Sequence, residues 1–187
     1  MLFLSSKIPL MDFIRILSSA DKYADELTEL YLGAFSENQR HTKEDFRHLL
    51  DTNKQFNCNA VLMNNQLIGF FHFWDFDDFL FLEHIAIEPP LRGHKLGEKV
   101  IKLVRSLAAK PLVIEVEQAE NSVFGARRIE FYRRLGFEIV PFEYLQPPYR
   151  VGEDYIPLEM MSDDLEFASE NFEKIKAKIY RQVYGIG

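Results

Sequence analysis

The chain has 187 residues, of which 47% are hydrophobic, and its 22 basic and 29 acidic side chains give a formal net charge of −7. The length suits a single domain over residues 1–187, and the apolar content is far from that of a disordered chain. The acidic balance argues against nucleic-acid binding, which requires a basic surface. A single cysteine, Cys58, excludes a disulfide framework, and without cysteine clusters or an HExxH spacing we expect no metal site.

The N-terminal segment, residues 1–10, is apolar but short, and Lys7 and Pro9 interrupt it. It lacks the basic leading region of a signal peptide, and no run of the chain approaches the ~20 apolar residues of a membrane span. We therefore expect a cytoplasmic protein with no membrane partner. If Met11 is the native start, residues 1–10 are an upstream extension.

The first half of the chain predicts a strand, two helices and a three-stranded antiparallel meander. Apolar residues repeat at helical spacing from Tyr23 to Ala34, and Thr42 opens a short second helix by a capping-box pattern. Asn64-Asn65 is typical of a tight hairpin turn, because Asn tolerates positive φ. The predicted strands span residues 12–17, 60–63, 66–76 and 79–87.

The second half predicts alternating helices and strands. A helix over residues 97–109 leads to a strand over residues 112–117, and such a crossover usually pairs parallel strands. A further helix spans residues 124–135, and strands over residues 137–140 and 155–161 form a hairpin. Asp163 caps a last helix within a C-terminal extension, residues 162–187. This order indicates an α+β fold with a mixed, mostly antiparallel sheet.

The stretch from Phe81 to Glu98 carries the first functional signal. It has the pattern of a buried strand, a turn rich in Pro and Gly, and the start of a helix. The first turn of a helix presents unpaired backbone N–H groups and the positive end of the helix dipole. Such a turn is a site for phosphate or pyrophosphate, so the sequence predicts a phosphorylated cofactor.

Two motifs then resemble the GNAT N-acetyltransferase superfamily. The Q/R-x-x-G-x-G/A signature for acetyl-CoA corresponds to Arg92-Gly93-His94-Lys95-Leu96-Gly97, and an aromatic-Tyr pair before Gly-Phe corresponds to Phe131-Tyr132 before Gly136-Phe137. The resemblance implies the acyl-CoA N-acyltransferase fold, with helices flanking a central sheet of about six to seven strands. It also implies that pantetheine pairs with the backbone at Ile85, Ala86 and Ile87, and that the pyrophosphate rests on residues 92–97.

Lys95 departs from this signature, because the family usually has its first glycine there. The side chain would crowd the pyrophosphate if Lys95 needed positive φ, or it would point outward and add charge near a phosphate. We expect a tolerated substitution, since backbone amides dominate the binding.

Tyr132 and Glu83 are the predicted catalytic residues. By resemblance, Tyr132 stabilises or protonates the CoA thiolate, although it could instead be a core tyrosine. Glu83 is predicted to be the general base, on the same strand face as Ile85 and Ile87 by alternation. Glu115, Glu117 or water are alternatives. His84 is expected on the opposite face, as a core or surface histidine.

Other positions at and before the helix that carries Tyr132 bear on CoA binding. Many family members have an Asn that contacts CoA seven residues before the tyrosine, but this position is Gly125, and Asn121 falls four residues too early. Arg127 and Arg128 could approach the CoA phosphates, although a solvated helix face is favoured.

The sequence thus predicts an N-acetyltransferase in which an amine attacks the acetyl-CoA thioester directly. The alternative is a non-catalytic acyl-CoA sensor or interaction module of the same fold. The acceptor, a small molecule or a peptide amine, stays open, as do a homodimer and the role of the C-terminal extension. The loops at residues 36–41 and 144–153 are expected to shape the acceptor pocket.

Overall fold

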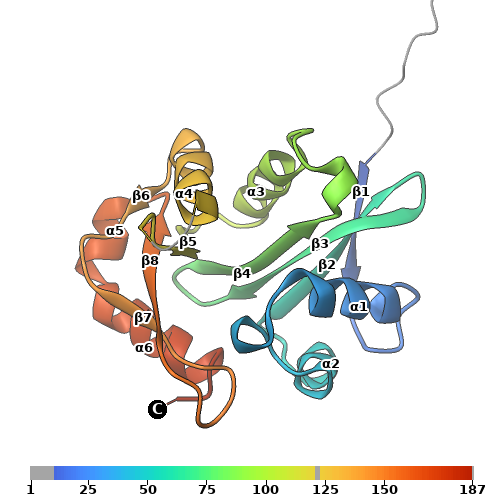
Figure 1. Ribbon diagram of the computed structural model, residues 1–187, viewed down its shortest axis with the longest axis horizontal. Helices are drawn as coiled ribbons and strands as arrows, with labels where there is room; N and C mark the ends of the chain where they lie inside the picture. The colour runs from blue at the N-terminus through green and yellow to red at the C-terminus, as the bar shows by residue number, and fades with distance from the viewer. Residues whose placement is uncertain (1–10, 121–122, 187) are drawn as a thin grey trace, which may run out of the picture.

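The computed structural model describes residues 11–120 and 123–186 (Figure 1). It contains six α-helices, two short 3₁₀ segments and eight strands. The strands are β1 (Met11–Ile16), β2 (Phe56–Met63), β3 (Gln66–Asp75), β4 (Leu80–Ile87), β5 (Leu112–Glu117), β6 (Glu138–Ile139), β7 (Tyr144–Gln146) and β8 (Ile156–Ser162). The helices are α1 (Ala24–Ala34), α2 (Lys43–Thr52), α3 (Leu96–Leu107), α4 (Val123–Arg134), α5 (Leu165–Glu170) and α6 (Phe172–Gln182).

All eight strands lie in one mixed sheet of order β1-β2-β3-β4-β5-β8-β6, with β7 also paired to β8. Every pairing is antiparallel except β4 with β5, which are parallel and joined through α3, as the crossover pattern predicted. The predicted hairpin at residues 137–161 is more elaborate than expected, because β6 and β7 both pair with β8. The sheet therefore has eight strands instead of six to seven.

Helices cover both faces of this sheet and make a three-layer structure (Figure 1). One core cluster holds apolar residues from α1, α2, α5 and α6, and the other holds those of α3 and α4. The alternation of strand residues between the two clusters places large apolar side chains on each face. The C-terminal extension thus packs on the same face as α1 and α2. No helix in the described residues is long and apolar enough to cross a membrane.

Local signals located several element boundaries and missed others. Asn64 and Asn65 adopt φ of 53° and 63° in the β2–β3 turn, and the Thr42 side chain accepts a hydrogen bond from the Asp45 amide at the start of α2. The predicted cap of the last helix was wrong by one residue: Asp164 caps α5, whereas Asp163 accepts hydrogen bonds from Arg105 and the Leu112 amide. The predicted single helix is also divided at residue 171 into α5 and α6.

Candidate active site

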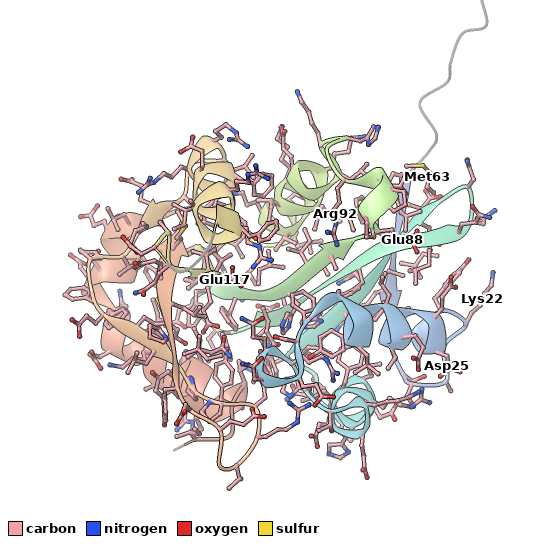
Figure 2. The ribbon with its side chains drawn as sticks, viewed as in Figure 1. Lys22, Asp25, Met63, Glu88, Arg92 and Glu117 are labelled. Carbon is pink, nitrogen blue, oxygen red and sulfur yellow. The ribbon has the colours of Figure 1, made fainter. Side chains whose placement is uncertain are left out.

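The parallel pairing of β4 with β5 stops partway along both strands. It comprises three pairs and ends at Leu82 opposite Ile114, although β4 continues to Ile87 and β5 to Glu117. Figure 2 places Glu117 near the end of β5 and Arg92 beyond the end of β4. The two strands therefore diverge into a fork.

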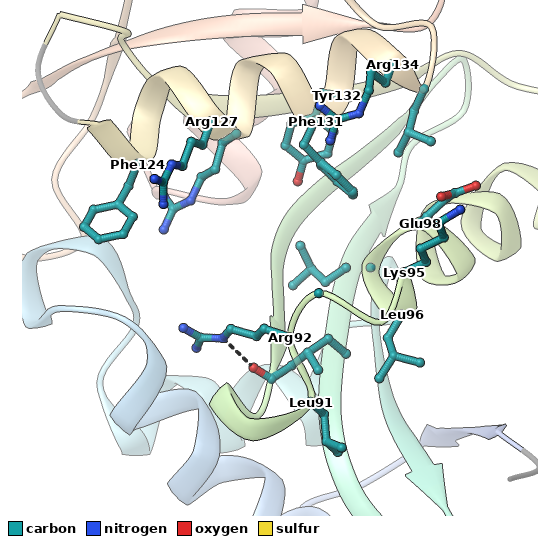
Figure 3. Close-up of a pocket in the computed structure, with 16 residues that line it drawn as sticks. Leu91, Arg92, Lys95, Leu96, Glu98, Phe124, Arg127, Phe131, Tyr132 and Arg134 are labelled. Atoms are coloured by element: carbon teal, nitrogen blue, oxygen red, sulfur yellow. Dashed lines mark hydrogen bonds between the residues drawn. The ribbon is translucent and has the colours of Figure 1, made fainter. Parts of the chain in front are cut away.

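The edge of β4 that faces this fork has backbone groups directed away from β3. The Glu88 amide donates to the Ile68 carbonyl at 2.9 Å, so alternation directs the backbone groups of Ile85 and Ile87 to the opposite side. The Ile87 carbonyl accepts a hydrogen bond from Arg92 Nε at 3.0 Å (Figure 3). Ala86 lies in register with Phe70 of β3, and its side chain joins the core cluster of the other face.

A cavity of about 680 Å³ lies at this fork, a size typical of ligand sites. The turn after β4 and the start of α3 form one wall, and α4 forms the other (Figure 3). Of the predicted cofactor-binding residues, all but two line it, the exceptions being Ala86 and His94. The lining residues from the predicted set are Ile85, Ile87, Arg92, Gly93, Lys95, Leu96 and Gly97.

The start of α3 has the geometry of an anion cradle. Gly93 has φ of 85°, and a Cβ added there would meet no atom within 4 Å. Lys95 is the N-cap of α3, with φ of 58° and no side-chain cap. Lys95 therefore adopts the left-handed conformation that a glycine takes more easily, and its exposed side chain lies beside Glu98 (Figure 3). The first backbone amides of a helix have no acceptor within it, and the residues that carry them in α3, Leu96, Gly97 and Glu98, line the cavity.

Tyr132 reaches the same cavity from α4. Its ring packs against Phe131 and Phe137, with ring centroids 5.1 and 5.5 Å away, and the residue is buried. Its hydroxyl points into the cavity (Figure 3) and hydrogen-bonds to no residue of the described chain. Burial raises the pKa of Tyr132 to about 12. The ring of Tyr132 thus belongs to the core while its hydroxyl reaches the cavity. A core tyrosine and a residue that assists the CoA thiolate are therefore compatible roles.

Glu83 lies on the other face of the sheet, so the alternation argument was wrong. The β3–β4 register shifts between the His72–His84 and Phe73–Leu82 pairs, which leaves Glu83 as the extra residue of a β-bulge. A bulge changes the face of every residue on one side of it. Glu83 and His84 therefore share the face of α1, whereas Ile85 and Ile87 face the cavity.

Polar groups surround the buried Glu83 carboxylate. Trp74 Nε1 donates to Oε2 at 2.6 Å and the Tyr149 hydroxyl donates to Oε1 at 2.8 Å. Nitrogens of His41, His72 and His84 lie 3.3, 3.5 and 3.5 Å from its oxygens. Burial alone would raise the pKa of Glu83, but the imidazoles, His72 foremost, outweigh burial and hold this pKa well below its ordinary value. Glu83 is therefore ionised at neutral pH.

His72, Glu83 and His84 offer metal-ligand atoms within 4.8 Å of one another. Two imidazoles and one carboxylate are a set that zinc uses in enzymes. Hydrogen bonds already engage most of these atoms, however, because His72 Nε2 and His84 Nδ1 share one at 2.8 Å and both carboxylate oxygens accept one, whereas His72 Nδ1 is buried without a partner. The absence of a metal therefore stays a prediction.

The two alternative bases on β5 differ in their surroundings. Glu115 accepts hydrogen bonds from the Tyr144 and Tyr184 hydroxyls, the latter at 2.6 Å, and burial raises its pKa to about 7. Glu117 lies 3.4 Å from Arg128 Nη1 in an ion pair at the cavity. Glu117 is thus paired with a cavity-lining residue of α4, while Glu115 lies on the face of Glu83.

Residues of α4 complete the cavity in ways that the sequence did not predict. Arg127 and Arg128 are solvent-exposed, as favoured, but they also line the cavity, together with Phe124, Phe131 and Arg134. These residues are three or four positions apart, and this helical spacing was the signal in the sequence that could have placed them on one face of α4. Gly125 is explained by close packing, because a Cβ there would lie 2.5 Å from the Gln118 carbonyl oxygen. Asn121 lies outside the described residues.

The fold and the diverging strands define an acyl-CoA N-acyltransferase fold, and solved structures share it. A structure described as "Putative acetyltransferase from GNAT family from Bacteroides thetaiotaomicron" superposes with a TM-score of 0.86 at 31% identity, over 94% of this chain and 99% of that one. Arabidopsis thaliana NAA60, in complex with acetyl-CoA, superposes with a TM-score of 0.63 at 13% identity, over 82% of this chain and 97% of that one.

Comparison of the sequence with known families agrees with the fold. Residues 22–137 match the family described as "Acetyltransferase (GNAT) family", and this chain belongs to that family. A Bacillus subtilis (strain 168) protein named "Putative acetyltransferase YjbC" is 33% identical over 67 residues. That match covers 35% of this chain and 34% of the relative, so the chain matches about a third of the length of its curated relative.

Proposed function

We propose that this protein is an N-acetyltransferase that moves the acetyl group of acetyl-CoA to an amine nitrogen by direct attack. The observation that carries the proposal is the early end of β4–β5 pairing after Leu82 and Ile114, at a cavity that begins at the N-terminus of α3 and is reached by Tyr132. The acceptor would be a small-molecule or peptide amine, and the reaction would take place in the cytoplasm.

The cavity fits CoA in shape and charge. The α3 amides and the open space above Gly93 would hold the pyrophosphate, since helix N-termini favour anions. Lys95, Arg127 and Arg128 add positive charge along the same walls. The backbone groups of Ile85 and the amide of Ile87, which point away from β3, would pair with the amides of the pantetheine arm, as an additional strand pairs with a sheet edge.

Acetyl-CoA would supply a thioester carbonyl and a thiolate leaving group. The acceptor nitrogen forms a bond to the carbonyl carbon, and the carbon–sulfur bond breaks. An aliphatic amine with a pKa of ~10.4 is mostly protonated at neutral pH and must lose a proton before it attacks. Because the pKa of Glu83 is held low, this carboxylate would accept the proton only in passing and deliver it to water. Backbone amides at the β4 bulge, which directly follows the last β4–β5 pair, would polarise the carbonyl.

Tyr132 would stabilise the departing sulfur by a hydrogen bond and not by full proton transfer. Its pKa of about 12 exceeds that of an ordinary thiol, roughly 8.5, by about 3.5 units. Complete transfer of the phenolic proton to thiolate would therefore cost about 5 kcal/mol. A hydrogen bond that strengthens as charge develops on sulfur needs no such transfer.

The test is the Tyr132→Phe variant, assayed for CoA-thiol release from acetyl-CoA with a panel of primary amines. We expect kcat to fall about 10- to 100-fold with little change in acetyl-CoA affinity by calorimetry, because only the hydrogen bond to sulfur is lost. Tyr180→Phe is a matched control, since that hydroxyl donates to the Leu145 carbonyl away from the cavity.

A sensor or interaction module of the same fold is the competing function. It predicts that the wild-type protein binds acetyl-CoA but releases no thiol with any amine. Failure to bind acetyl-CoA at all would contradict both functions.

A further inference from the structure

The carboxylate of the proposed base is enclosed by protein. The Glu83 side chain is 1% exposed, and it does not line the cavity between α3 and α4. It lies on the opposite face of the sheet, so an acceptor and the water that takes its proton would both have to arrive from that face. For the proposed function, some part of the chain must therefore move away from Glu83.

The connection between β7 and β8, residues 147–155, covers Glu83 from that face, and we call it the strap. The Tyr149 hydroxyl donates to Glu83 Oε1 at 2.8 Å, and the Tyr149 ring packs edge-on against His41 with ring centroids 4.7 Å apart. Arg150 Nη1 donates to a backbone carbonyl between α1 and α2. The strap thus joins the end of β8 to the loop that follows α1.

Backbone pairing contributes little to holding the strap in place. The β7–β8 ladder ends at the pair of Gln146 and Ile156. Among the described residues, the one backbone hydrogen bond of the strap is internal, from the Glu153 amide to the Arg150 carbonyl at 3.3 Å. Val151 at its tip is fully exposed to solvent. The strap is therefore held closed by side-chain contacts and not by a backbone ladder.

Buried polar atoms without partners gather at the strap. Four side-chain atoms of the described residues are buried with no hydrogen-bond partner, and three of them lie in the strap, at its end or beneath it: Glu153 Oε2, Gln146 Nε2 and His41 Nε2. Each such atom carries a desolvation cost, which hydration on opening would remove. These costs destabilise the closed strap relative to an open one.

We propose that the strap is a gate over Glu83, latched in this structure by the Tyr149–Glu83 hydrogen bond and opened to admit the acceptor and to release its proton to water. The inference deepens the proposed function and rests on it for the use of the open state. The motion itself depends only on the contacts of the strap. While the strap is closed, neither an acceptor nor water reaches Glu83, so the gate separates a resting state from a reacting one.

Modification of histidines by diethyl pyrocarbonate, mapped by mass spectrometry, measures opening without any turnover. His41 is the probe, because its Nε2 is buried against Tyr149 and hydrogen-bonds to no described residue. His48 and His94 are exposed and report the intrinsic rate, whereas His72 has no exposed surface and reports global unfolding. In the wild-type protein, His41 should react more slowly than His48 and faster than His72.

Tyr149→Phe removes the latch hydroxyl and keeps the ring. We expect it to raise the rate of His41 modification about 10-fold or more, the factor for one lost hydrogen bond to a charged group, because this rate follows the open population. Tyr155→Phe is the matched control, since Tyr155 is an exposed residue of the same strap and is not among the groups that contact Glu83. Arg150→Met removes the other anchor and should act in the same direction as Tyr149→Phe.

Three results would overturn the gate: wild-type His41 that reacts as fast as His48 or only as slowly as His72, a rate that Tyr149→Phe leaves unchanged, or equal acceleration of His41 and His72, which is global unfolding. Thiol release from acetyl-CoA with amines separates the gate from the proposed function. If the latch controls His41 but no thiol is ever released, the proposed function fails and the gate stands. If thiol is released but Tyr149→Phe leaves His41 protected, the gate fails and the function stands.

Discussion

Replacing Lys95 separates the backbone and charge effects of an unusual residue in the phosphate turn. Lys95 caps α3 with φ of 58° and ψ of 19°. A side chain with Cβ in this conformation costs roughly 1–2 kcal/mol, which Lys95→Ala retains and Lys95→Gly removes. Glycine also increases the entropy of the unfolded chain, which opposes this gain by about 0.4–1 kcal/mol. We therefore expect Lys95→Gly to be more stable than Lys95→Ala by about 0.5–1 kcal/mol.

Urea unfolding of the two variants measures this difference directly, and in a chain of this size it corresponds to about 1–4 °C in melting temperature. Both variants lose the same charge, so both should bind CoA a few-fold more weakly than wild type, and the deficit should shrink at high salt. The reasoning is refuted if Lys95→Ala is as stable as Lys95→Gly. It is also refuted if only one variant loses CoA affinity.

The remaining predictions concern packing, protonation and metal. Gly125→Ala should destabilise the protein by about 1–3 kcal/mol in urea unfolding, because the new Cβ would lie 2.5 Å from the Gln118 carbonyl; wild-type stability would contradict the packing. The folded-state pKa of Glu115, about 7, exceeds its ordinary 4.5, so its contribution to stability is full below pH 4.5 and is lost as pH rises through 7. Wild type should thus lose about 3 kcal/mol relative to Glu115→Gln between pH 4.5 and 8, and parallel pH curves would disprove this. Dialysis against EDTA should leave activity and melting temperature unchanged; a zinc-dependent rise in melting temperature that His72→Ala abolishes would establish a metal site.

Much of the fold could be predicted because its signals are local. The Asn64-Asn65 turn, the Thr42 cap and the crossover through residues 97–109 depend on neighbouring residues, and all are confirmed. The α+β class was predicted from the order of elements and the family from two short motifs, and both are confirmed. The start of β2 at Phe56, four residues early, shows the limit of such reasoning, because pairing with β3 extends the strand beyond its own apolar pattern.

The predicted strand face of Glu83 was wrong for a specific reason. A period of two assigns faces correctly only while no residue is added to the strand, and the bulge at Glu83 adds one. Nothing in the residues from Phe81 to Ile87 marks the bulge, because it arises from the pairing with β3. The same shift brought His84 to the carboxylate that it was expected to avoid.

The sequence alone determined the phosphate turn, the crossover and the candidate tyrosine. Each depends on residues close together in the chain, because helix ends, glycines and apolar spacing are recognised within a few positions. Glu83 and Tyr149 are separated by 66 positions in the chain, and Glu115 and Tyr184 by 69 positions, yet each pair is hydrogen-bonded. Only the tertiary structure could decide these contacts, since they depend on where β4 and β5 part and on how the C-terminal segment packs over the fork.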